Sequence, residues 1–354
     1  EGSDLTVTVD AGAQRLATSL LNAQGPGALV ALEPKTGAVR AMVSTPGYDP
    51  NEIPARLDEF NNLPDGADSV LLNRTTQGRY APGSTMKVVT AAAALDSGDF
   101  EPDSVVDGTD GVEISGVPLQ NSGNFSQSQI TLTDALTNSV NTAWAQVAED
   151  LGEDTMVEYM ERFGFFKLPP LDYPDQQMTA SGPRKTNGRL TRSGFDVGRV
   201  AIGQGGAEGQ MQATPIQIAM IAATVANGGK LMEPTFLQDV TDPDGRVTDE
   251  LDPDEVRQVI APETAAELTE MMTNVTQEGT ASNLNITGTD VFAGKTGTAE
   301  RDLQGLNQAW FMMFAPADDP QIAIAATVES CQGCFGGTVA GPIATAVAEE
   351  LLGG

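Results

Sequence analysis

Histidine is absent from this chain of 354 residues, and its absence narrows the chemistry that the protein can perform. Without histidine, neither a Ser-His-Asp triad nor a Cys-His pair can form. Zinc sites that depend on histidine ligands are excluded as well. A nucleophilic serine in this chain would therefore need a different side chain as its base.

Basic residues and long apolar runs are also scarce. Lys and Arg number 19 against 49 Asp and Glu, so the formal net charge is −30. This charge argues against nucleic acid or an anionic bilayer as the main partner. The most apolar segment, at 216–226, is too short to span a membrane and is predicted to form a core helix.

Cysteine is limited to Cys331 and Cys334. Two thiols without histidine make a poor metal site, and the pair does not begin a helix as a thioredoxin-like motif would. We predict a short disulfide, formed in an oxidising compartment, with two free thiols as the alternative. No metal and no cofactor is expected.

The strongest chemical signal is the segment at 80–87, which reads YAPGSTMK. Its proline and glycine predict that Ser84 begins a helix, where free N–H groups and the positive end of the helix dipole favour an anion. Lys87 follows by three residues and so shares a helix face with Ser84. The apolar run at 88–95 predicts a buried helix. Burial would lower the pKa of Lys87 and allow its neutral amine to act as the base.

Two further motifs follow in the chain. Ser139 and Asn141 lie between two helical patterns, and Lys295-Thr296-Gly297-Thr298 precedes a pair of predicted strands. The set Ser-x-x-Lys, Ser-x-Asn and Lys-Thr-Gly, in this order, resembles the motifs of penicillin-binding proteins and class A β-lactamases.

The predicted elements favour an α+β fold. Apolar runs at 27–32 and 38–43 predict a hairpin, and two more strands are predicted at 310–315 and 321–328. The simplest assembly is an antiparallel sheet built from both chain ends, with helices inserted between them. Further predictions are helices at 11–21, 131–138, 142–152, 262–279 and 343–352, a hairpin at 233–250, and a polar loop at 169–195 that carries Arg184, Lys185, Arg189 and Arg192. We expect this loop to be solvated, with contact to an anionic ligand as the alternative.

Over almost its whole length the chain resembles the transpeptidase domain of class B penicillin-binding proteins, and especially the actinobacterial penicillin-binding protein A group. The likeness lies in residues 5–10, 27–51, 72–74, 80–95, 134–144, 202–204, 214–217, 293–300 and 309–316. It implies a penicillin-binding protein transpeptidase or serine β-lactamase-like fold, with a sheet flanked by helices and an all-helical subdomain. One such domain would fill residues 1–354, with 1–26 leading in from a missing N-terminal anchor and module.

The resemblance also implies catalytic roles. Ser84 would attack the penultimate D-Ala of a peptidoglycan stem peptide, and Lys87 would take its proton. Ser139 would relay a proton to the leaving amine, while Asn141 would hydrogen-bond Lys87 and the substrate amide. Lys295 would supply a positive charge that lowers the pKa of Lys87 and attracts the substrate carboxylate.

Substrate-binding roles are implied for the third motif. The hydroxyl groups of Thr296 and Thr298 would hold the substrate carboxylate. The backbone N–H groups of Ser84 and Thr298 would form the oxyanion hole. Glycine at Gly294 and Gly297 would allow a ligand to approach the strand edge closely.

The resemblance implies a cell-wall enzyme outside the bacterial cytoplasmic membrane, with stem peptides and β-lactam antibiotics as ligands and other cell-wall synthesis proteins as partners. Only the missing N-terminal helix would contact the membrane. A D,D-carboxypeptidase, a β-lactamase and a non-enzymatic β-lactam sensor remain alternatives. The β-lactamase is disfavoured because no Glu-x-x-Leu-Asn segment, which could supply a deacylating glutamate, lies between Ser139 and Lys295. Met313 departs from many relatives, which carry glycine there, and the 331–334 loop is not a general family feature.

Overall fold

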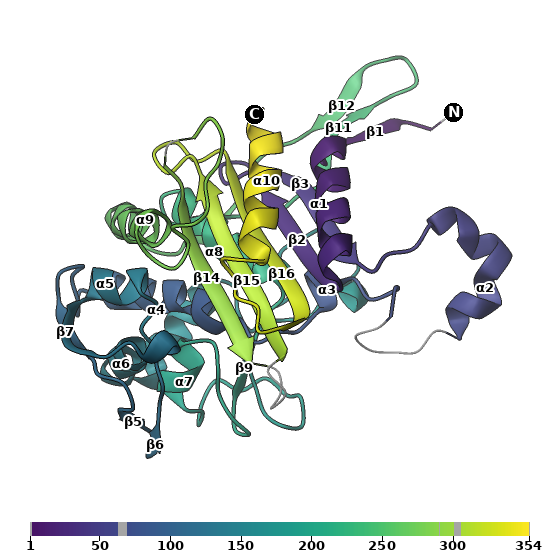
Figure 1. Ribbon diagram of the computed structural model, residues 1–354. Helices are drawn as coiled ribbons and strands as arrows, with labels where there is room; N and C mark the ends of the chain where they lie inside the picture. The colour runs from purple at the N-terminus through teal and green to yellow at the C-terminus, as the bar shows by residue number, and fades with distance from the viewer. Residues whose placement is uncertain (1, 63–68, 290, 301–305, 354) are drawn as a thin grey trace.

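A five-stranded antiparallel sheet lies at the centre of the computed structural model, which describes residues 2–62, 69–289, 291–300 and 306–353 (Figure 1). The strand order is β14-β15-β16-β2-β3. The strands are β2 (Gly27–Leu32), β3 (Val39–Thr45), β14 (Ala293–Glu300), β15 (Leu306–Ala315) and β16 (Ile322–Gln332). Strand β2 pairs with β16, so the two ends of the chain share one sheet, and the predicted assembly is confirmed.

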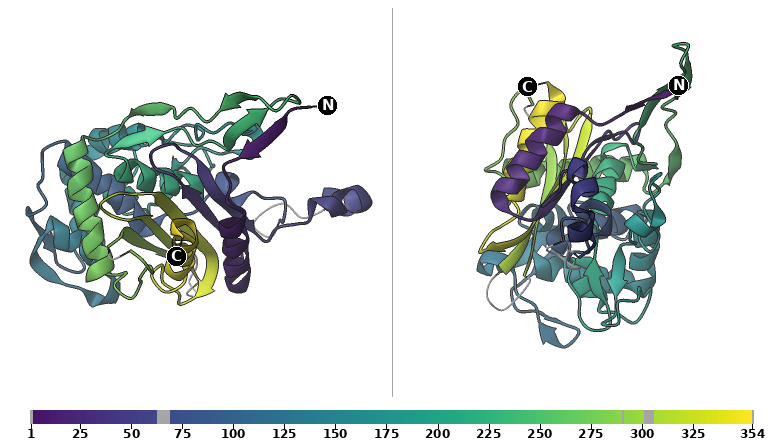
Figure 2. Two further views of the ribbon diagram at one scale, coloured as in Figure 1. Left: turned by 90° about the horizontal axis from the view of Figure 1, so that it is seen from above. Right: turned by 90° about the vertical axis from the view of Figure 1, so that its right-hand side faces the viewer.

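Both faces of this sheet are covered, which explains why β2 is buried along its whole length. Helices α1 (Ala11–Gln24) and α10 (Ala340–Leu352) lie side by side on one face (Figure 2). Helix α8 (Pro215–Ala226) packs on the other face. Almost every residue of α8 is buried, as its uninterrupted apolar sequence predicts for a core helix.

A helical region lies beside the β14 edge of the sheet (Figure 1). It contains α4 (Lys87–Asp96), α5 (Leu132–Thr137), α6 (Asn141–Arg162), α7 (Val197–Ala201) and α9 (Pro262–Gln277). Helix α4 is buried from Lys87 to Leu95 and packs against α6 and α9. The side chain of Thr131 caps α5 by accepting a hydrogen bond from the N–H of Asp134, as predicted.

One predicted helix boundary is wrong and another is confirmed. Ser84 does not begin an α-helix: it lies in a 3-10 turn, η2 (Gly83–Met86), and α4 begins at Lys87. The helix expected to end at Gly152 does break there, where φ is 81° and ψ is 165°, and a second helical segment of α6 runs on to Arg162. Glycine relieves the strain of that positive φ, so the chain can resume helical geometry immediately afterwards.

The remaining elements are short. They are helices α2 (Ile53–Asn61) and α3 (Arg74–Gln77), 3-10 turns at Pro50–Glu52, Ser122–Asn124 and Asp175–Gln177, a sheet of β1 (Asp4–Val7), β11 (Leu237–Thr241) and β12 (Val247–Glu250), and the pairs β4 (Val105–Gly108) with β7 (Gln127–Thr131), β5 (Glu113–Ile114) with β6 (Val117–Pro118), β8 (Gly182–Arg184) with β9 (Gln210–Gln212), and β10 (Lys230–Met232) with β13 (Glu255–Gln258). The hairpin predicted at 233–250 is confirmed, and β1 adds a third strand to it. Among the described residues, no helix combines the length and the apolar character needed to cross a membrane.

Candidate active site

The turn that carries Ser84 lies directly against strand β14. Gly83 has a φ of +54°, and a Cβ atom at this position would lie 2.8 Å from the carbonyl oxygen of Thr298 and 3.2 Å from its nitrogen. A Cβ at Gly297 would lie 2.8 Å from the carbonyl oxygen of Pro82. Glycine at both positions therefore lets the two backbones meet, and half-buried Ser84 lies beside the backbone of Thr298.

Two fully buried lysines meet at one serine hydroxyl group. Nζ of Lys87 donates to the carbonyl oxygen of Ser139 and to Oδ1 of Asn141, each at 2.7 Å, and lies 3.3 Å from Oγ of Ser139. Nζ of Lys295 donates to the same Oγ at 2.8 Å and to the carbonyl oxygen of Thr296 at 3.2 Å. The three sequence motifs are therefore joined through Ser139.

This arrangement favours a neutral amine. Burial lowers the pKa of Lys87 well below its ordinary value of 10.5, and the charge of Lys295 lowers it further. Burial also lowers the pKa of Lys295, to about 7. The amine of a neutral Lys87 has two N–H groups, which can donate hydrogen bonds to the carbonyl oxygen of Ser139 and to Oδ1 of Asn141. Its one lone pair is then free to take a proton.

Ser139 owes its position to an unusual backbone conformation. Its φ is 56°, in the left-handed region that residues other than glycine rarely adopt. The residue forms the tight turn between α5 and α6, where both its carbonyl oxygen and its hydroxyl group reach a buried lysine. Asn141 begins α6, and its Nδ2 donates to the carbonyl oxygen of Gln120 at 2.9 Å, which holds the amide toward Lys87.

The hydroxyl groups of the third motif have protein partners. Oγ1 of Thr296 lies 2.6 Å from Oγ1 of Thr280. Oγ1 of Thr298 accepts a hydrogen bond from the N–H of Gly336 at 3.3 Å, so its own proton remains available for an anionic ligand. The expected reason for Gly297 is wrong, because the missing side chain makes room for the Ser84 turn rather than for a ligand. The space at Gly294 is likewise filled, by the ring of Phe311.

A buried ion pair supports the segment that leads to Ser84. Nε of Arg74 donates to Oε1 of Glu329 at 2.7 Å, and the hydroxyl group of Tyr80 donates to the same oxygen. Nε1 of Trp310 donates to the carbonyl oxygen of Ala81 at 3.0 Å. Sequence analysis assigned no role to Arg74 or Glu329, because no local pattern can link residues so far apart. The contacts of Gln120 and Thr280 were missed for the same reason.

Cys331 and Cys334 form a disulfide near the end of β16. Both sulfur atoms approach the carbonyl oxygen of Asn307 on β15. The chain then turns back over β14, where Gly336 contacts Thr298, so the disulfide closes the loop that precedes this contact. Within the described part of the chain, no group of three or more Cys, Asp or Glu side chains is placed to hold a metal ion.

Comparisons with known proteins agree on one family. The protein-family model described as "Penicillin binding protein transpeptidase domain" matches residues 27–349 of this chain. Peptidoglycan D,D-transpeptidase PbpA of Mycolicibacterium smegmatis is 33% identical over 99% of this chain and 73% of that protein. PbpA of Mycobacterium tuberculosis is 34% identical over 93% of this chain and 67% of its own length.

Solved structures show the same likeness. The D,D-transpeptidase domain of a peptidoglycan glycosyltransferase from Eggerthella lenta superimposes with a TM-score of 0.86 at 30% identity, covering 99% of this chain and 83% of that one. Penicillin-binding protein A from M. tuberculosis, solved as a ceftriaxone acyl-enzyme complex, gives a TM-score of 0.84 at 31% identity, covering 99% and 80%.

The buried ion pair leads to a stability prediction. Arg74→Met should lower the free energy of unfolding by about 3–5 kcal/mol, because it leaves the Glu329 carboxylate buried without this partner. As a matched control, Lys35→Met removes the exposed ion pair with Asp319 and should cost no more than about 1 kcal/mol. Urea unfolding of both variants measures the difference. Equal costs would show that the buried pair does not stabilise this region.

Proposed function

The chain belongs to the penicillin-binding protein transpeptidase domain family, and we propose that it cross-links peptidoglycan stem peptides through an acyl-enzyme on Ser84. It is a serine-type D,D-transpeptidase of cell-wall synthesis that β-lactams acylate, and the predicted likeness to the penicillin-binding protein A group is confirmed. One observation carries the assignment of the site: Lys87 and Lys295 converge on Ser139, beside the turn of Ser84.

In the first step, Oγ of Ser84 attacks the carbonyl carbon of the penultimate D-Ala, and its proton passes to the lone pair of Lys87. The carbonyl oxygen becomes an oxyanion, which accepts hydrogen bonds from the N–H groups of Ser84 and Thr298. In comparable sites, each such donor stabilises the transition state of acyl transfer by about 3–4 kcal/mol. The C–N bond then breaks, a proton passes through the hydroxyl group of Ser139 to the leaving nitrogen, and terminal D-Ala departs.

In the second step, an amine of a neighbouring stem peptide attacks the ester carbonyl. Its proton moves to the site base, the bond to Ser84 breaks, and the serine regains its proton as the new amide forms. The positive charge of Lys295 and the hydroxyl groups of Thr296 and Thr298 hold the terminal carboxylate of the substrate before acylation. Asn141 orients Lys87 and the substrate amide.

The cellular setting is part of the same proposal. Peptidoglycan lies outside the cytoplasmic membrane, so we place the enzyme there, held by an N-terminal membrane helix. Residues 1–354 would act as one transpeptidase domain, with 1–26 leading in from the anchor. Other cell-wall synthesis proteins would be its partners.

The role of Ser84 is tested by intact-mass spectrometry after treatment with penicillin G. The wild-type chain should gain one adduct that persists for hours, because the sequence between Ser139 and Lys295 contains no Glu-x-x-Leu-Asn segment that could supply a deacylating glutamate. Ser84→Ala should gain none, while Ser193→Ala, at an exposed serine, should label normally. Labelling of Ser84→Ala would contradict the mechanism. Rapid loss of the wild-type adduct would indicate a β-lactamase, and the absence of any adduct a scaffold.

The lysine pair leads to a pH prediction. Acylation requires neutral Lys87, so the rate should rise with pH as this amine loses its proton. Lys295→Met removes a charge that lowers the pKa of Lys87, so the rising limb of the acylation profile should move to higher pH. The shift should be greatest below pH 7, where Lys295 is protonated.

The measurement is the pH at which the acylation rate rises, rather than the maximal rate. Lys295→Met also removes a hydrogen bond to Ser139, which can change the maximal rate by itself. Lys230→Met, at an exposed lysine paired with Glu255, is the control and should leave the profile in place. A profile for Lys295→Met that coincides with that of wild type would refute the coupling of the two lysines.

The disulfide should matter more for acylation than for stability. It closes a very short loop, so replacing both cysteines with serine should cost at most about 2 kcal/mol. The acylation rate should fall, because the loop positions Gly336 against Thr298. Penicillin labelling kinetics and thermal melting of the Cys331→Ser, Cys334→Ser variant measure the two effects. An unchanged acylation rate would exclude a role in positioning.

A further inference from the structure

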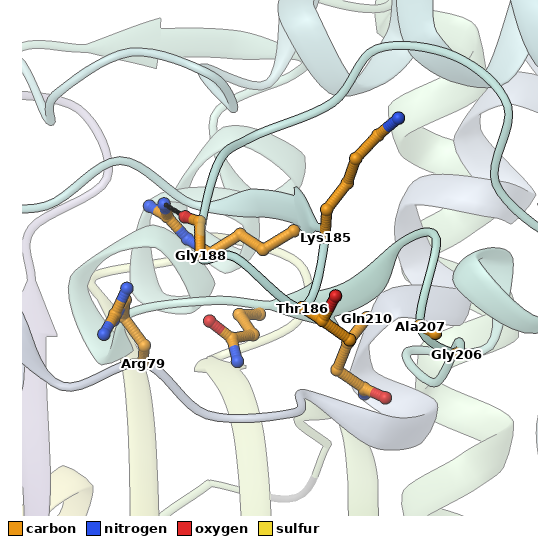
Figure 3. A pocket seen from close by; sticks show the side chains of 9 residues that line it. Arg79, Lys185, Thr186, Gly188, Gly206, Ala207 and Gln210 are labelled. Carbon is orange, nitrogen blue, oxygen red and sulfur yellow. Dashed lines mark hydrogen bonds between the residues drawn. The ribbon is translucent and has the colours of Figure 1, made fainter.

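A cavity of about 510 Å³ lies beside Arg79, between this arginine and the segments that carry Lys185 and Gln210 (Figure 3). Its lining includes Arg79, Arg184, Lys185, Gly188 and Gln212. Among the described residues, three cations and no carboxylate line this cavity, in a chain whose net charge is −30. Two of these cations belong to the loop that we expected to be solvated.

Arg184 is held in place without an acidic partner. Nη1 donates to the carbonyl oxygen of Gly188 at 2.8 Å, and Nη2 donates to the carbonyl oxygen of Ala180. Its Nε is buried and has no hydrogen-bond partner in the structure. Backbone carbonyl groups therefore fix the orientation of this guanidinium group but leave its charge without a counterion among the described residues.

Arg79 adds a second guanidinium group to the same corner. Burial, and then the charge of Arg79, lower the pKa of Arg184, so the two like charges lie within electrostatic reach of each other. Arg79 is exposed and forms no ion pair within the described ranges. Lys185 points away from Arg79 in Figure 3, and its Nζ is 4.0 Å from exposed Glu208. An anion between the two arginines would relieve their repulsion.

The cavity is close to Ser84 along the chain, because Arg79 belongs to the segment that leads to this serine. Arg79 precedes Tyr80, which exchanges backbone hydrogen bonds of 3.1 and 2.8 Å with Ala213, the neighbour of Gln212 in the cavity wall. Ser84 follows Arg79 by five positions along the chain, so their Cα atoms can be at most about 18 Å apart. An extended peptide covers about 3.3–3.6 Å per residue. The side chain of Arg79 and a side chain of the substrate both extend into the distance between Ser84 and the cavity, so one or two substrate residues can span it.

On the basis of the proposed function, we propose that this cavity is a subsite for a free carboxylate group on the peptide substrate, one or two residues before the acylated D-Ala. A guanidinium group recognises a carboxylate through paired, charge-assisted hydrogen bonds. A peptide carboxylate fits better than a phosphate polymer, because the strongly acidic chain repels a long polyanion while one carboxylate needs only this local pair of arginines.

The test uses matched peptides that end in D-Ala-D-Ala and carry, on the residue before this pair, either a free carboxylate or the corresponding amide. A second matched pair carries the same groups one residue earlier. We expect the wild-type chain to release D-Ala from the carboxylate form of one pair with a kcat/KM about tenfold higher than from its amide form. Arg79→Gln should reduce this ratio to about one. Arg189→Gln, which changes an exposed cation outside the cavity lining, should retain the wild-type ratio.

Three results would overturn the proposal. Equal kcat/KM values for both pairs, in wild-type chain that penicillin G still acylates, would remove the subsite but leave the proposed function intact. If neither penicillin G nor any of the peptides acylates Ser84, both the subsite and the proposed function are overturned. Binding of inorganic polyphosphate that is lost in Arg79→Gln, without any preference among the peptides, would instead assign the cavity to a polyanion.

Discussion

The chemistry of this protein depends on one buried hydroxyl group that two lysines share. Lys87 and Lys295 are both fully buried, and both reach Oγ of Ser139. Two ammonium groups cannot both be held without cost in a site that excludes water. Burial lowers the pKa of both lysines, and the charge of Lys295 lowers the pKa of Lys87 further. A chain without histidine thereby obtains a base that can act near neutral pH.

Close backbone packing brings the nucleophile to the strand that would bind the substrate. Glycine at Gly83 and Gly297 removes the two Cβ atoms that would separate the Ser84 turn from β14. The ion pair of Arg74 with Glu329 ties the segment before this turn to β16, the central strand of the sheet. The position of Ser84 is therefore set by contacts with distant strands rather than by its own helix.

Several of the few positive charges of this acidic chain lie at the lysine pair, at the buried ion pair and at the cavity. The acidic excess gives a net charge of −30, yet three of the few lysines and arginines are fully buried at Arg74, Lys87 and Lys295. Others gather around the cavity beside Arg79. These six cations thus lie where they can stabilise the site or meet an anion, while the carboxylates are mostly solvated.

The amino-acid sequence by itself determined the sheet built from both ends, the buried helix after Ser84, and the three motifs, because hydrophobic periodicity and motif spacing are local properties. It also indicated Ser84, Lys87, Ser139, Asn141 and Lys295 as the residues to examine. Only the tertiary structure decided that Ser84 lies in a 3-10 turn, that Gly297 accommodates protein rather than ligand, and that Arg74 pairs with Glu329. These features arise from contacts between segments far apart in the chain, which no local pattern records.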